Sequence, residues 1–121
     1  MVIETAINNL NDTDQRALDV LVERLSEQYG DHVRSVLIFG SKARGDARAD
    51  SDIDVLAVLD NDDPRLRSQV RRTAARVSLE YDVLISIRAV SRSRWKEMSE
   101  YEYPLYKTIK AEGIRLDHRL E

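Results

Sequence analysis

Two short motifs, separated by one loop, carry the residue types that chemistry on phosphates requires. Gly40 and Ser41 end one apolar run, and after ten intervening residues the pair Asp52 and Asp54 opens a second apolar run. Because strand residues i and i+2 point to the same side, the two aspartates project together while Ile53 points into the core. Two carboxylates held this close repel each other, and a divalent cation relieves that repulsion. Magnesium suits the pair, since it takes oxygen ligands, commonly one or two carboxylates plus substrate phosphates.

The Gly-Ser motif offers what a phosphate chain needs. Gly40 lets the backbone approach a ligand without a Cβ in the way. Ser41 supplies a hydroxyl and a backbone N–H at the expected start of a helical turn, where phosphates are favoured. Lys42 and Arg44 follow closely and would offset phosphate charge. Each residue alone also fits a turn, a cap or a solvated cation. Together with the aspartates, they predict a site for a nucleoside triphosphate and magnesium.

The segment GSKARGDARADSDID, residues 40–54, resembles the signature of the minimal nucleotidyltransferases, a branch of the DNA polymerase β-like superfamily. That signature is Gly-Ser, ten residues and then Asp-x-Asp, and it is met here without a gap. The resemblance implies an enzyme that moves a nucleoside monophosphate, most directly AMP from ATP, onto a hydroxyl and releases pyrophosphate. It also implies two magnesium ions and a third carboxylate from a later strand. Asp82 is the expected third catalytic and metal-binding residue, with Glu80 as the fallback; alternatively, Asp82 only ends the preceding helix.

The resemblance further suggests what the enzyme modifies. Minimal nucleotidyltransferases of this kind act as antitoxins that transfer AMP to a tyrosine of a HEPN-type ribonuclease toxin, and such a toxin is the expected protein partner. Two alternatives stay open. The chain is a binding antitoxin that occludes its partner with little or no catalysis, or it is a dimeric, aminoglycoside-type nucleotidyltransferase that modifies a small molecule. The sequence leaves the base preference and a homo-oligomer undecided.

Composition limits the remaining function classes. At 121 residues, the chain is expected to form one domain, 1–121. Its hydrophobic content of 42% and charged content of 34% are typical of a soluble globular protein. It has no cysteine, no apolar run approaching a membrane span and no signal-peptide pattern at its start, so we expect a cytoplasmic protein. A net charge of −3 argues against general nucleic-acid binding.

The order of predicted elements indicates an α+β domain in which a small mixed β-sheet carries helices packed largely on one face, as in the polymerase β-like nucleotidyltransferases. Periodicity and end signals predict helices over 12–29, 64–81, 91–98 and 104–111, and strands over 33–39, 53–59, 83–90 and 114–116. Asp12 is the expected N-cap of the first helix. The glycine at position 30 suits the end of that helix.

Some further residues invite a functional interpretation. Five arginines follow the second strand and are expected to form a solvated helix face, or a docking surface for an acidic partner or RNA: Arg65, Arg67, Arg71, Arg72 and Arg76. His32 and His118 lack ligand-spaced neighbours and are expected at the surface. Trp95 and Tyr106 are expected to pack the terminal helices onto the sheet; the alternative is that one aromatic ring stacks on a base or a partner.

Overall fold

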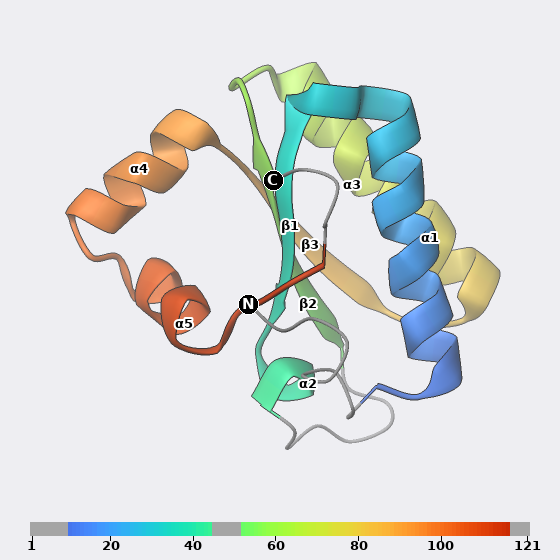
Figure 1. The fold of residues 1–121 in the computed structure, drawn as a ribbon. Helices are drawn as coiled ribbons and strands as arrows, with labels where there is room; N and C mark the ends of the chain where they lie inside the picture. Colours follow the sequence, from blue (N-terminus) through green and yellow to red (C-terminus); the bar gives the residue numbers. More distant parts are fainter. Residues whose placement is uncertain (1–9, 45–51, 117–121) are drawn as a thin grey trace.

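The structure is a computed structural model that describes residues 10–44 and 52–116, and Figure 1 shows its fold. The α-helices of this part are α1 (Asp12–Tyr29), α2 (Ser41–Arg44), α3 (Pro64–Tyr81), α4 (Arg92–Glu100) and α5 (Pro104–Glu112). A 3-10 turn, η2, covers Gly30–His32. The strands are β1 (Val33–Phe39), β2 (Ile53–Leu59), β3 (Ile85–Ser91) and β4 (Ile114–Arg115). The α+β class predicted from the sequence is confirmed.

The four strands form one mixed sheet in the order β3-β2-β1-β4. Strand β1 is antiparallel to both β2 and β4, whereas β2 and β3 are parallel and are connected through α3. A parallel pair needs such a crossover, and an 18-residue helix supplies it. The end of β1 therefore lies beside the start of β2, where Phe39 pairs with Asp54. The two sequence motifs meet at this edge of the sheet.

Helices cover both faces of the sheet, and the main core lies on one of them. The long helices α1 and α3 pack together on one face, while α4 and α5 lie on the other (Figure 1). On β2, the side chains of Ile53 and Val55 join the core under α1 and α3, whereas Leu56 and Val58 join a smaller cluster with Ile109 of α5. Because strand side chains alternate, Asp54 belongs to the face that carries α5.

The ends of the helices explain two differences from the sequence-based expectations. The prediction that Asp12 caps α1 is wrong, since the Asn11 side chain accepts the hydrogen bond from the Asp14 N–H at 2.8 Å. Strand β3 begins at Ile85 rather than at residue 83, because α3 ends on Asp82 in the left-handed conformation with φ 52°. In the part of the chain described here, no helix is long and apolar enough to cross a membrane.

Candidate active site

Gly40 and Asp54 lie close together in the site. Gly40 follows β1 with φ +79°, a conformation that favours glycine, and its backbone packs directly against the Asp54 carboxylate. A Cβ built at position 40 would overlap Oδ2 of Asp54. The glycine of the Gly-Ser motif is therefore required both by its backbone conformation and by the neighbouring carboxylate. This contact brings the two motifs together in space.

The two aspartates form an electrostatically strained pair. Asp52 is exposed just before β2, and Asp54 is partly buried within the strand. Burial raises the pKa of Asp54, and the negative charge of Asp52 raises it further, while Arg88 and Arg44 act in the opposite direction. A bound cation would offset both the lost hydration and the repulsion.

The two aspartate carboxylates provide oxygen ligands of the kind that magnesium prefers. Asp52 and Asp54 provide carboxylate oxygens, and the described residues hold no cluster of three or more metal-ligating side chains. Magnesium is commonly bound by one or two carboxylates, with water and substrate phosphates completing its octahedral shell. The residues present therefore fit an ion that arrives with a nucleotide better than one held permanently by the protein.

Glu112 is a site residue that sequence reasoning missed. Its carboxylate accepts a hydrogen bond from the Gly40 N–H at 2.9 Å and pairs with Nη1 of Arg44 at 3.1 Å and 3.3 Å. The Glu112 side chain is only 18% exposed, and its charge also contributes to the raised pKa of Asp54. The Glu112 carboxylate thus occupies Arg44, which was predicted to offset phosphate charge, and the backbone N–H of Gly40, next to the Ser41 N–H that was predicted to receive phosphates.

Lys42 does not lie with the other predicted nucleotide-binding residues. Its ammonium forms a 3.0 Å ion pair with the Asp14 carboxylate of α1, and Lys42 is 2% exposed. Both side chains are therefore buried between α2 and α1, where they tie the Gly-Ser segment to the helical layer. This geometry does not support direct contact between Lys42 and phosphates. Ser41, by contrast, begins α2 next to Gly40 and is partly exposed.

The structure does not bring Asp82 beside Asp54. The register of the parallel pair sets Ser86 opposite Asp54, and Asp82 lies three residues before the start of β3 as the exposed C-cap of α3. The fallback, Glu80, instead pairs with Arg24 of α1 at 2.6 Å. On β3, the polar residues that neighbour Asp54 are thus Ser86, which has a hydroxyl, and Arg88, which is a cation.

Two other predictions can be located. His32 is exposed, as expected, and its Nδ1 lies 2.9 Å from Oδ2 of Asp60. His118 and the loop residues 45–51 between the two motifs lie outside the described residues. Trp95 and Tyr106 pack against each other with ring centroids 5.1 Å apart, and Trp95 lies against the smaller core cluster, as predicted.

Comparison with known proteins agrees with this geometry. The Nucleotidyltransferase domain family matches residues 18–114. Two relatives come from Methanocaldococcus jannaschii. "Putative protein adenylyltransferase MJ0604" is 28% identical over 100 residues, or 83% of this chain and 94% of its own length. "Putative protein adenylyltransferase MJ0141" is 45% identical over 58 residues, or 46% of this chain, which spans only 58% of that relative.

A solved structure shares the fold at low sequence identity. A chain in a toxin-antitoxin crystal structure with AMP-PNP superimposes with a TM-score of 0.55 at 14% identity, covering 84% of this chain and 74% of that chain. At this identity the similarity establishes the architecture alone. The family match itself spans both motifs, strands β1, β2 and β3, and the Gly40–Asp54 contact. The chain is therefore a member of the nucleotidyltransferase domain family, and its enzyme class is that of a nucleotidyltransferase.

Proposed function

We propose that this chain is a magnesium-dependent adenylyltransferase that moves AMP from ATP to a tyrosine hydroxyl of a HEPN-type toxin and thereby acts as its antitoxin. The observation that carries the proposal is the packing of Gly40 against the Asp54 carboxylate beside Asp52. The names of the archaeal relatives support protein adenylylation, and the AMP-PNP in the toxin-antitoxin neighbour supports a nucleotide substrate.

The chain's own residues would divide the work between binding and charge neutralisation. Asp52 and Asp54 would hold magnesium, which offsets the charge of the triphosphate and lowers the pKa of the acceptor hydroxyl. The Gly40 N–H and Ser41 would hold the β- and γ-phosphates, and Arg44 would offset their charge. The acceptor oxygen forms a bond to the α-phosphorus, the bond from that phosphorus to the bridging oxygen breaks, and pyrophosphate leaves as the hydroxyl proton is lost.

Nucleotide binding would require Glu112 to give up its present partners. Its carboxylate occupies the Gly40 N–H and Arg44, and both groups are assigned here to the phosphates. A phosphate oxygen and a carboxylate oxygen cannot share the same donors without repulsion. We infer that Glu112 moves away from Gly40 and Arg44 when ATP binds.

The role of Asp82 as third carboxylate stays a prediction. To reach the Asp54 side of the sheet, the C-terminal end of α3 would have to rearrange, since Asp82 is its left-handed cap. Asparagine also tolerates the left-handed conformation, so Asp82→Asn tests the carboxylate without disturbing the cap. A loss of transfer of a hundredfold or more would assign Asp82 to catalysis. A loss below threefold would restrict it to capping.

The second candidate function is occlusion without catalysis. It is favoured by one observation, the occupation of the phosphate donors by Glu112. Expression of the toxin in cells with Asp52→Asn/Asp54→Asn separates the two functions, provided that the variant still binds the toxin. Catalytic neutralisation predicts that cells with this variant stop growing. Continued growth would instead assign neutralisation to binding alone.

A further inference from the structure

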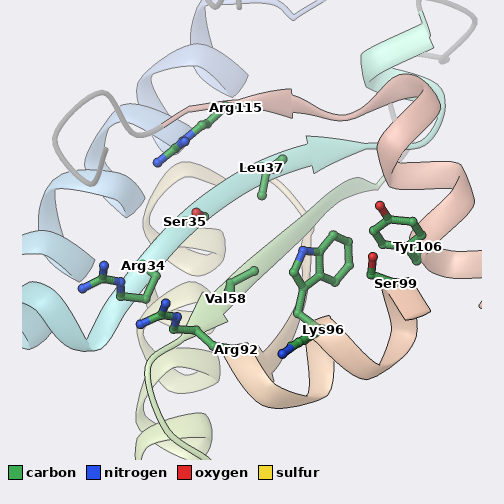
Figure 2. A pocket seen from close by; sticks show the side chains of 10 residues that line it. Arg34, Ser35, Leu37, Val58, Arg92, Lys96, Ser99, Tyr106 and Arg115 are labelled. Carbon is green, nitrogen blue, oxygen red and sulfur yellow. The ribbon is translucent and has the colours of Figure 1, made fainter. Parts of the chain in front are cut away.

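A second pocket lies on the face of the sheet that carries α4 and α5. Its volume is about 670 Å³, and its lining comes from β1, β2, α4, α5 and β4 (Figure 2). On β1 it includes Arg34, Ser35 and Leu37, and on β2 it includes Val58. Arg34 and Ser35 lie at the start of β1, Leu37 lies opposite Leu56 in the middle of the sheet, and Val58 lies near the end of β2. Four residues of strand, roughly 13 Å, take β2 from Asp54 to Val58. The pocket is thus separate from the candidate active site.

The inner part of this pocket is apolar and aromatic. Trp95 and Tyr106 form one wall with their rings tilted by 57°, and Leu37 and Val58 form the floor on the sheet (Figure 2). Both rings are only partly buried, so part of their surface faces the pocket. An exposed aromatic wall of this kind stabilises a planar ring by stacking, as it does for the bases of single-stranded nucleic acids.

The rim of the pocket is strongly cationic. Arg34, Arg92 and Lys96 are exposed, and among the described residues none of the three has a carboxylate within ion-pair distance. Arg115 adds a fourth cation, and the lining includes no acidic side chain. This concentration occurs in a chain whose net charge is −3, so it is a local feature rather than a general basic surface. Such a rim attracts an anion.

We propose that this basic–aromatic pocket binds a nucleoside phosphate, with the base against Trp95 and Tyr106 and the phosphate near Arg92 and Lys96. The ligand is either a free mononucleotide or one nucleotide of single-stranded RNA, because both present a planar base and a phosphate. The pocket volume lies within the range of about 300–1,000 Å³ that is typical of small-molecule sites. A purely anionic ligand would leave the aromatic wall unused, and a purely apolar one would leave Arg34, Arg92 and Lys96 without a counter-charge.

The single tryptophan of the chain makes the test direct. Trp95 is the only tryptophan, so a base that stacks on it quenches the intrinsic fluorescence of the protein. Titrations with AMP, a single-stranded hexanucleotide RNA and pyrophosphate are measured in EDTA on the Asp54→Asn background, which removes the proposed catalytic contribution. We expect saturable quenching by AMP or the RNA and none by pyrophosphate. Tighter binding of the RNA would identify RNA as the source, and equal or weaker binding would identify the free nucleotide.

Matched charge variants establish where the ligand binds. Arg92→Gln/Lys96→Gln removes two cations from the rim and is expected to weaken AMP binding at least fivefold. Arg71→Gln/Arg72→Gln removes two exposed cations from α3 and is expected to change it less than twofold. The proposal is overturned if the two double variants lose AMP affinity equally, or if neither AMP nor the RNA quenches the fluorescence saturably up to millimolar concentration. It is also overturned if a hexaglutamate peptide binds and neither AMP nor the RNA does. Because magnesium is absent, failure here is distinguishable from failure of the proposed transferase activity.

Discussion

Removing the negative charge of Glu112 is expected to strengthen nucleotide binding. Its carboxylate accepts hydrogen bonds from the Gly40 N–H at 2.9 Å and from Nη1 of Arg44 at 3.1 Å. ATP must displace it from both groups, and any charge that stays nearby repels the triphosphate. The Glu112 side chain, at the end of α5, therefore competes with the substrate for these two groups. Removing this side chain is expected to free both groups for the triphosphate.

The two contacts set the size of the effect. A hydrogen bond from a backbone N–H to a carboxylate contributes about 1.5 kcal/mol. The pair with Arg44 is partly solvent-exposed and contributes about 0.5 kcal/mol. Losing both in Glu112→Ala removes about 2 kcal/mol of competition, which corresponds to about 30-fold tighter binding at 1.4 kcal/mol per tenfold change. Glu112→Gln keeps a neutral hydrogen bond, loses about 1 kcal/mol and is expected to bind about fivefold more tightly.

The assay is calorimetric titration of AMP-PNP in excess magnesium, since this analogue binds without transfer of a nucleotidyl group. Glu100→Gln, an exposed glutamate at the end of α4, is the matched control and is expected to leave the dissociation constant within twofold of the wild type. Thermal unfolding of each variant checks that the fold is retained. Tenfold weaker binding of Glu112→Gln would refute the reasoning, because the carboxylate would then be a metal ligand rather than a competitor.

Three further perturbations probe the same site. Gly40→Ala is expected to abolish transfer by displacing the Asp54 carboxylate. Gly30→Ala is the control, because φ is also positive there, at +52°, but a Cβ built at Gly30 meets no atom within 4 Å. It is expected to lower the free energy of unfolding by about 1–2 kcal/mol and to leave transfer unchanged. Because the pKa of Asp54 is raised in the folded protein, the ionised Asp54 carboxylate destabilises the fold at pH 7. Asp54→Asn is therefore expected to raise the melting temperature at pH 7 without metal. This gain should shrink as the pH falls through the raised pKa and below the ordinary aspartate range, where the Asp54 carboxyl is protonated in both the folded and the unfolded chain. Lys42→Met leaves Asp14 as an unpaired buried charge and is expected to lower the free energy of unfolding by about 3–5 kcal/mol. The double variant Lys42→Met/Asp14→Leu should recover most of this loss and should bind AMP-PNP like the wild type in calorimetric titration. Weak binding by a stable double variant would assign Lys42 to the nucleotide.

The two motifs were predictable because their geometry is local. Alternation along β2 fixes the directions of Asp52 and Asp54, and the end of β1 fixes the position of Gly40. Glu112 was not predictable in this way, since 72 residues separate it from Gly40. It reaches the site because β4 pairs with β1 directly after α5, and the sequence pattern predicted a strand over 114–116 without indicating which strand it would pair with.

The directions of two predicted side chains depended on packing that spacing does not encode. Lys42 has the composition and position of a phosphate-binding cation, but Asp14 on the buried side of α1 binds its ammonium. Asp82 precedes an apolar run that resembles a strand from residue 83 onward, yet the left-handed cap of α3 delays the strand to Ile85. A contact with a neighbouring helix determined the outcome for Lys42, and the end of its own helix determined it for Asp82.

The most direct measurement compares ATP labelled at the α-phosphate with ATP labelled at the γ-phosphate, incubated with magnesium, this protein and the HEPN-type toxin proposed as its partner. Transfer of AMP predicts that the toxin acquires the α-label and not the γ-label from the wild-type enzyme. The toxin should acquire neither label when the enzyme is Asp54→Asn. The exposed aspartate variant Asp62→Asn is the matched control and should transfer like the wild type. Toxin labelled from the γ-phosphate, or labelled equally by Asp54→Asn, would contradict the assignment of this site to nucleotidyl transfer.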